Sequence, residues 1–137
     1  MLNMSFKIAF ICTGNSARSQ IAEGLAKHLA EIKNKNVTVF SAGSDPAGYV
    51  HPLALKVMSE KGIDISCQYS KSLEDIPITE LDLVITLCDG AKGACPNVPG
   101  ANRLHWAIPD PSGRGVDAFR WVRDELMSRI EKLMEEI

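Results

Sequence analysis

Short apolar segments alternate with helical patterns along most of the chain, and this order constrains the fold more than any other feature. We predict strands at residues 7–11, 37–41, 83–87 and 103–106. Helices are expected after the first two strands and again from about Asp117 to the C-terminus. Alternating strands and helices favour a parallel sheet, because right-handed crossovers return each strand to the same direction. The predicted fold is therefore α/β with three layers, a four-stranded parallel sheet flanked by helices on both faces.

The predicted helices carry apolar stripes or terminal signals. In the first, Ile21, Leu25 and Leu29 repeat every four residues. The second begins at Pro52, a favourable first helical residue, and is expected to end near Gly62. The inward stripe of the last helix is predicted to contain Phe119, Val122, Leu126, Ile130, Leu133 and Ile137. All of these elements fit one domain, residues 1–137.

The composition excludes several classes of protein. The net charge is −2, so the chain has no broad basic field that would hold nucleic acid or an anionic membrane. We find no signal peptide and no segment of transmembrane length, and we expect a cytoplasmic monomer. Thiols stay reduced in the cytoplasm, so the four cysteines are expected to be reactive or buried thiols and not a disulfide framework.

A motif for anion binding lies between the first predicted strand and the first helix. We call it the oxyanion loop, and it consists of Cys12, Thr13, Gly14, Asn15, Ser16, Ala17, Arg18 and Ser19. Its backbone N–H groups can surround a tetrahedral anion, and the helix N-terminus adds the positive end of its dipole. Gly14 permits a tight backbone, Asn15 tolerates unusual dihedral angles, and Arg18 can donate to two anion oxygens. The same field favours the thiolate of Cys12, which becomes a candidate nucleophile.

A candidate acid follows the fourth predicted strand, at Asp110 and Pro111. An acid in this position could protonate an oxygen that leaves the central atom of a bound oxyanion. With Ser112 and Gly113 after them, the same residues also make an ordinary turn. The residues alone leave both interpretations open.

Two further cysteines, Cys88 and Cys95, follow the third predicted strand. On a regular helix their Cα atoms would lie about 10.5 Å apart. A disulfide requires roughly 4.4–6.8 Å. We therefore expect residues 88–98 to form a mobile redox segment that differs between the reduced and oxidised forms. The alternatives are two incidental cysteines or a zinc site, but the C-x₂₋₄-C spacing and a third ligand are missing, and no metal is predicted.

These motifs resemble a known family over nearly the whole chain. Residues 10–20 with Ala22-Glu23-Gly24, and then Ser41-Ala42-Gly43, Thr86-Leu87-Cys88 and Asp110-Pro111, are similar to segments of low-molecular-weight tyrosine phosphatases and of the arsenate reductases built on that fold. The resemblance implies that Asp110 is the general acid. It also implies a cascade in which Cys12 attacks arsenate, Cys88 attacks the adduct, and Cys95 forms a Cys88–Cys95 disulfide that thioredoxin reduces.

The resemblance therefore implies arsenic detoxification, with arsenate as substrate and phosphate or sulfate as its mimics. The main alternative is a phosphatase that uses Cys12, Arg18 and Asp110. A third alternative is an oxyanion or redox sensor that docks a partner. Ser112 and Gly113 argue against a phosphatase, since the phosphatases resembled usually have aromatic residues there. No motif for an organic cofactor is present.

Other chemically notable residues have ordinary interpretations. Cys67 is expected to be a partly buried loop thiol, although a role as a substitute resolving thiol stays open. His51 and His105 lack ligand spacing and are expected to be satisfied or solvated. Some members of the family hold a monovalent cation near the loop with an acidic residue, and Lys71 takes that place here. Its ammonium could supply the charge, so no cation is predicted.

Overall fold

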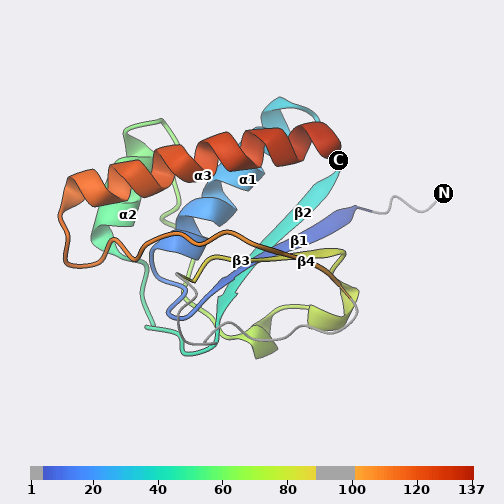
Figure 1. The fold of residues 1–137 in the computed structure, drawn as a ribbon, viewed down its shortest axis with the longest axis horizontal. Coiled ribbons are helices and arrows are strands. Elements are labelled where there is room, and N and C mark those ends of the chain that lie inside the picture. Colours follow the sequence, from blue (N-terminus) through green and yellow to red (C-terminus); the bar gives the residue numbers. More distant parts are fainter. Residues whose placement is uncertain (1–4, 89–100) are drawn as a thin grey trace.

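The computed structural model describes residues 5–88 and 101–137. Within these residues, four parallel strands form one sheet in the order β2-β1-β3-β4 (Figure 1). The central strands are β1 (Phe6–Cys12) and β3 (Leu83–Thr86), and the edges are β2 (Val37–Gly43) and β4 (Asn102–His105). The predicted four-stranded parallel sheet is confirmed.

Three α-helices pack on one face of the sheet (Figure 1): α1 (Arg18–Ile32), α2 (Pro52–Ser59) and α3 (Val116–Glu136). Their apolar side chains form the main core with alternate strand residues such as Phe10 and Ile85. The other strand residues, including Ile11 and Val84, point to the opposite face. In the described part of the chain, that face packs against residues in and beside two short 3-10 helices, η1 (Leu73–Asp75) and η2 (Ile78–Glu80). Among these residues the α-helices therefore cover one face, whereas helices on both faces were predicted.

The observed elements differ from the predicted ones at their ends and in one buried charge. β2 continues through Ala42 and Gly43, because these residues pair with Ile11 and Cys12 of β1. The inward stripe of α3 is as predicted except that Ile137 is only partly buried. Arg123 is also buried on this helix, which an apolar pattern could not indicate. Its guanidinium group lies 2.8 Å from Glu60 Oε1 and donates to the Val57 carbonyl at 2.9 Å.

The sheet brings three strand ends together at one edge. Cys12 is the last residue of β1, and Cys88 follows β3 by two positions. The Leu87 N–H donates to the Ile11 carbonyl at 2.8 Å, and the Ile108 N–H donates to the Leu87 carbonyl at 3.4 Å. The segments that follow β1, β3 and β4 therefore lie side by side. None of the described helices is long and apolar enough to span a membrane.

Candidate active site

The oxyanion loop connects β1 to the first turn of α1. Asn15 has φ 46°, a left-handed conformation that asparagine tolerates better than most residues. Ala17 precedes α1 without a side-chain capping hydrogen bond. The first N–H groups of the helix therefore have no side-chain cap at Ala17, and they carry the positive end of the helix dipole. These are the properties of an anion cradle.

The glycine that this loop requires is Gly43, and the sequence argument for Gly14 was wrong. A Cβ atom on Gly43 would lie 2.4 Å from the Thr13 carbonyl oxygen and 3.0 Å from the Asn15 nitrogen. On Gly14 the nearest atom would be Ala47 Cβ at 3.8 Å, an ordinary contact. Gly14 also has no positive φ. The close approach occurs between the loop and the end of β2, so only the tertiary structure reveals it.

Cys12 is almost completely buried, with 2% of its surface exposed, and its sulfur has two hydrogen-bond partners. The Asn15 N–H donates to Sγ at 3.3 Å, and Ser19 Oγ lies 2.9 Å from Sγ. Because Asn15 Nδ2 donates to Ser19 Oγ at 2.8 Å, the hydrogen of the Ser19 hydroxyl is free to point at the sulfur. Both groups therefore place a hydrogen toward Sγ, the candidate nucleophilic atom.

A buried polar network continues from Asn15 to Lys71. Asn15 Nδ2 donates to Ser41 Oγ at 3.0 Å, and Ser41 donates to Glu23 Oε1 at 2.5 Å. The Lys71 ammonium lies 3.6 Å from the same carboxylate oxygen and donates to the Tyr69 carbonyl at 3.0 Å. Burial lowers the pKa of Lys71, and the charge of Glu23 opposes that shift. The ammonium thus lies beside both the Glu23 carboxylate and the Ser41 hydroxyl, 3.5 Å from the latter.

Arg18 connects the loop to the two neighbouring strand ends. Its Nη1 donates to the Ile108 carbonyl at 2.9 Å and to the Leu87 carbonyl at 3.4 Å. Within the described residues, Nε and Nη2 have no protein acceptor and can donate to an anion. One guanidinium group therefore holds the segments that lead into Cys88 and Asp110.

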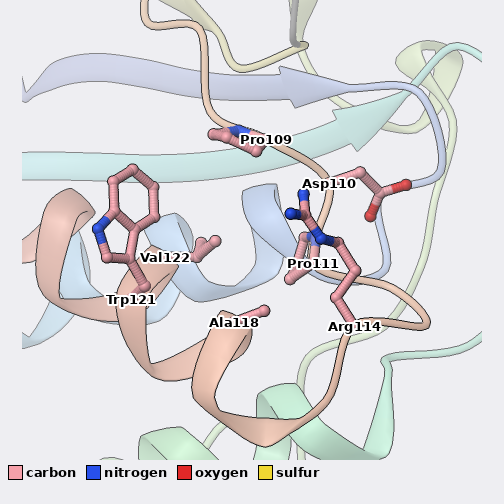
Figure 2. A pocket seen from close by; sticks show the side chains of 7 residues that line it. All are labelled: Pro109, Asp110, Pro111, Arg114, Ala118, Trp121 and Val122. Carbon is pink, nitrogen blue, oxygen red and sulfur yellow. The ribbon is translucent and has the colours of Figure 1, made fainter.

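Asp110 lies two residues beyond this anchor, at the edge of a pocket of about 260 Å³ between residues 109–111 and α3. Figure 2 shows Asp110 at one end of the lining residues and Trp121 at the other. The carboxylate is exposed and accepts a hydrogen bond from the Ser112 N–H at 3.0 Å. The turn expected from the sequence is therefore present. No hydrogen bond joins Asp110 to Cys12 or Arg18 in the described part of the chain.

The cysteines differ in state and exposure. Cys88 is buried and disulfide-bonded, whereas Cys12 and Cys67 are free thiols. Cys67 is exposed, which differs from the partly buried position expected for it. Cys95, and with it the predicted redox segment beyond Cys88, lies outside the described residues. Among residues 5–88 and 101–137, no cluster of three His, Cys, Asp or Glu side chains could hold a metal.

His51 and His105 each have a hydrogen-bond partner, as expected. His51 caps α2, because its Nδ1 accepts from the Leu53 N–H at 3.1 Å, and its ring packs 4.6 Å from that of Phe119. His105 Nδ1 lies 2.7 Å from Thr86 Oγ1.

Backbone N–H groups from outside the oxyanion loop also hold it in place. The N–H groups of Asp45 and Ala47 donate to the carbonyls of Thr13 and Gly14 at 2.9 and 2.8 Å. The His51 N–H donates to the Ser16 carbonyl at 3.0 Å. These are backbone contacts across a long loop, so no side-chain pattern could indicate them.

Comparisons with known proteins agree on one family. The family model described as low molecular weight phosphotyrosine protein phosphatase matches residues 7–137. An arsenate reductase of Brevibacillus brevis is 45% identical over 130 residues, which cover 93% of each chain. A solved arsenate reductase in the phosphate binding state shares 38% identity and covers 96% of this chain and 98% of its own, with a TM-score of 0.82. A thioredoxin-dependent arsenate reductase of Corynebacterium glutamicum shares 35% identity, with a TM-score of 0.80 over 99% of this chain and 63% of its own. The chain therefore belongs to the low molecular weight phosphotyrosine protein phosphatase family.

Proposed function

We propose that this protein reduces arsenate to arsenite with a cascade of three cysteines and that thioredoxin regenerates it. One observation carries the proposal. A free Cys12 thiol lies at the base of the oxyanion loop, while Cys88, at the adjacent strand end, is disulfide-bonded. A phosphatase needs the first feature but not the second. The relatives named above support the same activity, because they are arsenate reductases that match nearly the whole chain.

The first step uses the geometry of the loop. The loop N–H groups and the Nε and Nη2 donors of Arg18 bind the oxygens of arsenate. The Cys12 thiolate attacks arsenic, and a protonated Asp110 gives its proton to the departing oxygen, which leaves as water. Asp110 is exposed at the neighbouring strand end, so the step requires it to turn toward the bound anion. The product is an adduct with a Cys12 sulfur–arsenic bond.

The next steps move two electrons from sulfur to arsenic. The Cys88 thiolate attacks the Cys12 sulfur, and the electron pair of the sulfur–arsenic bond stays on arsenic. Arsenic(V) becomes arsenic(III), arsenite leaves, and a Cys12–Cys88 disulfide remains. The Cys95 thiolate then attacks Cys88 and releases the Cys12 thiolate. The dithiol of reduced thioredoxin finally reduces the Cys88–Cys95 disulfide.

Arg18 supports the transfer between the first two cysteines. Its bond to the Leu87 carbonyl holds the residue that precedes Cys88 against the guanidinium group that binds the anion. The adduct and the second thiol are thereby kept at the same edge of the sheet. Thiol–disulfide exchange depends on access of the attacking sulfur, so this proximity favours the second step.

The second candidate function is a phosphatase, which the family model itself supports. It would use Cys12, Arg18 and Asp110 in the same way, with water in place of Cys88. The pocket beside Asp110 contains the ring of Trp121 and two prolines and could receive an aromatic leaving group. A phosphatase would not depend on Cys95.

The test is consumption of NADPH by the protein with thioredoxin and thioredoxin reductase, with and without arsenate. We expect arsenate-dependent turnover in the wild type, loss of turnover in Cys95→Ser, and retention in Cys67→Ser. Cys67→Ser is the matched control, because it removes an exposed free thiol. Hydrolysis of an aryl phosphate at equal rates by the wild type and Cys95→Ser, without arsenate turnover, would establish the phosphatase instead. Loss of turnover in Cys67→Ser would show that Cys67 takes part in the cycle and that the resolving role is not correctly assigned to Cys95.

A further inference from the structure

One buried hydroxyl group in the oxyanion loop, that of Ser16, has no hydrogen-bond partner among the residues that the structure describes. Within the described residues, Ser16 Oγ is the only buried side-chain nitrogen or oxygen atom without a hydrogen bond. The side chains of Asn15 and Ser19 in the same loop are bonded to protein atoms. The exception is therefore confined to one atom, inside the segment that binds the anion.

The position of Ser16 is held from outside the loop. Its carbonyl accepts a hydrogen bond from the His51 N–H at 3.0 Å, and His51 in turn caps α2. Ser16 also lies between Cys12 and Arg18 in the chain, four residues after the nucleophile and two before the arginine. The backbone that carries the unpartnered hydroxyl is thus fixed next to the site.

A buried hydroxyl without a partner destabilises the folded protein, because it has lost its hydrogen bonds to water. Such groups are rare in native structures and call for a physical reason. A bound tetrahedral oxyanion offers several acceptor oxygens at this loop. A hydrogen bond from a neutral hydroxyl to an anion is also stronger than one to a neutral acceptor.

We propose that Ser16 is a substrate-binding side chain whose hydroxyl donates a hydrogen bond to an oxygen of the bound oxyanion. This inference rests on the proposed function only in placing the anion in the loop. It predicts effects of opposite sign in the free and bound protein. Removal of the hydroxyl relieves an unsatisfied group in the free protein and removes a donor from the complex.

The experiment measures binding of inorganic phosphate to the reduced protein by calorimetry, together with the Tm of the free protein. In Ser16→Ala we expect phosphate affinity to fall about tenfold, while the Tm is unchanged or higher. Ser16→Thr retains a hydroxyl and is expected to recover most of the affinity. Ser59→Ala is the control, because the Ser59 hydroxyl donates to the Lys56 carbonyl on the exposed part of α2 and should leave both measurements unchanged.

Three results would overturn the inference. The first is wild-type phosphate affinity in Ser16→Ala. The second is a Tm several degrees lower in Ser16→Ala, which would show a structural role. The third is no phosphate binding by the wild type, which would remove the anion from the loop. If phosphate binds and Ser16→Ala weakens it while the wild type fails to turn over arsenate, the role of Ser16 stands and the proposed function falls.

Discussion

Gly43 provides a sharp test of how the oxyanion loop is held. A Cβ atom at this position would lie 2.4 Å from the Thr13 carbonyl oxygen, whereas ordinary contacts begin at 3.4 Å. The two groups must therefore separate by 1.0 Å, the difference between these distances. β2 cannot simply move away, since Gly43 pairs with Cys12 in the sheet and donates to the Lys71 carbonyl at 2.9 Å. The strain falls on the loop.

The expected magnitude follows from this overlap. An added methyl group in a packed site costs about 1–3 kcal/mol. For a domain of this size, each kcal/mol lowers the Tm by roughly 3–5 °C. A displacement of about 1 Å in a catalytic loop can reduce the rate about 100-fold. Gly43→Ala is therefore expected to lose both stability and anion binding.

The assay compares Gly43→Ala with Gly14→Ala by thermal unfolding and by calorimetry with phosphate. Gly14 belongs to the same loop, but a Cβ atom there makes only an ordinary contact at 3.8 Å. Its substitution should leave the Tm unchanged or raise it, because alanine reduces the entropy of the unfolded chain. A wild-type Tm in Gly43→Ala, or a larger loss in Gly14→Ala, would refute the reasoning.

Three other expectations concern the surroundings of the site. Lys71→Met removes the ammonium beside buried Glu23, while Lys27 still pairs with that carboxylate. We expect the free energy of unfolding to fall by about 3 kcal/mol, near the lower end for a broken buried pair. Urea unfolding measures this change, and a fall of less than about 1 kcal/mol contradicts the expectation. His51→Ala removes the cap of α2 and the ring contact with Phe119 and should cost about 2 kcal/mol, with partial recovery in His51→Asn, which can still cap the helix. The hydrogen bonds from Arg120 and Arg123 lower the pKa of Glu60 from 4.5 to about 2. The stabilisation that ionised Glu60 gives the folded protein is therefore present above pH 4.5 and is lost as the pH falls toward 2. Between these two pH values, the Tm of Glu60→Gln should fall by less than the Tm of the wild type.

The main elements of this fold could be predicted because their signals are local. The apolar run of β1 consists of consecutive residues. The repeat of Ile21, Leu25 and Leu29 joins residues that are four positions apart on one helix. The oxyanion loop could be recognised for the same reason, since its chemistry lies in eight consecutive residues. The family assignment, and the expectation of an arsenate reductase within it, agree with the comparisons.

The ends of the elements, including the extent of β2, were harder to predict from the sequence. Ala42 and Gly43 look like the end of a strand, but pairing with β1 extends β2 through both. Arg123 looks like a solvated helix residue, yet it pairs with Glu60, 63 positions away, in addition to its neighbour Asp124, and is buried. In each case a partner distant in the chain overrides the local preference.

By itself, the sequence determined which chemical groups this protein has and roughly where its strands, helices and loop begin. The tertiary structure alone decided which of these groups meet. Arg18 reaches a carbonyl 90 positions away, and Gly43 is required because a strand end touches the loop. The Ser16 hydroxyl is unpartnered within residues 5–88 and 101–137 because the segments around it bury it without offering an acceptor. The physical reason is common to all three. Close packing and hydrogen-bond satisfaction depend on atoms brought together from separate segments, and a linear pattern does not contain those distances.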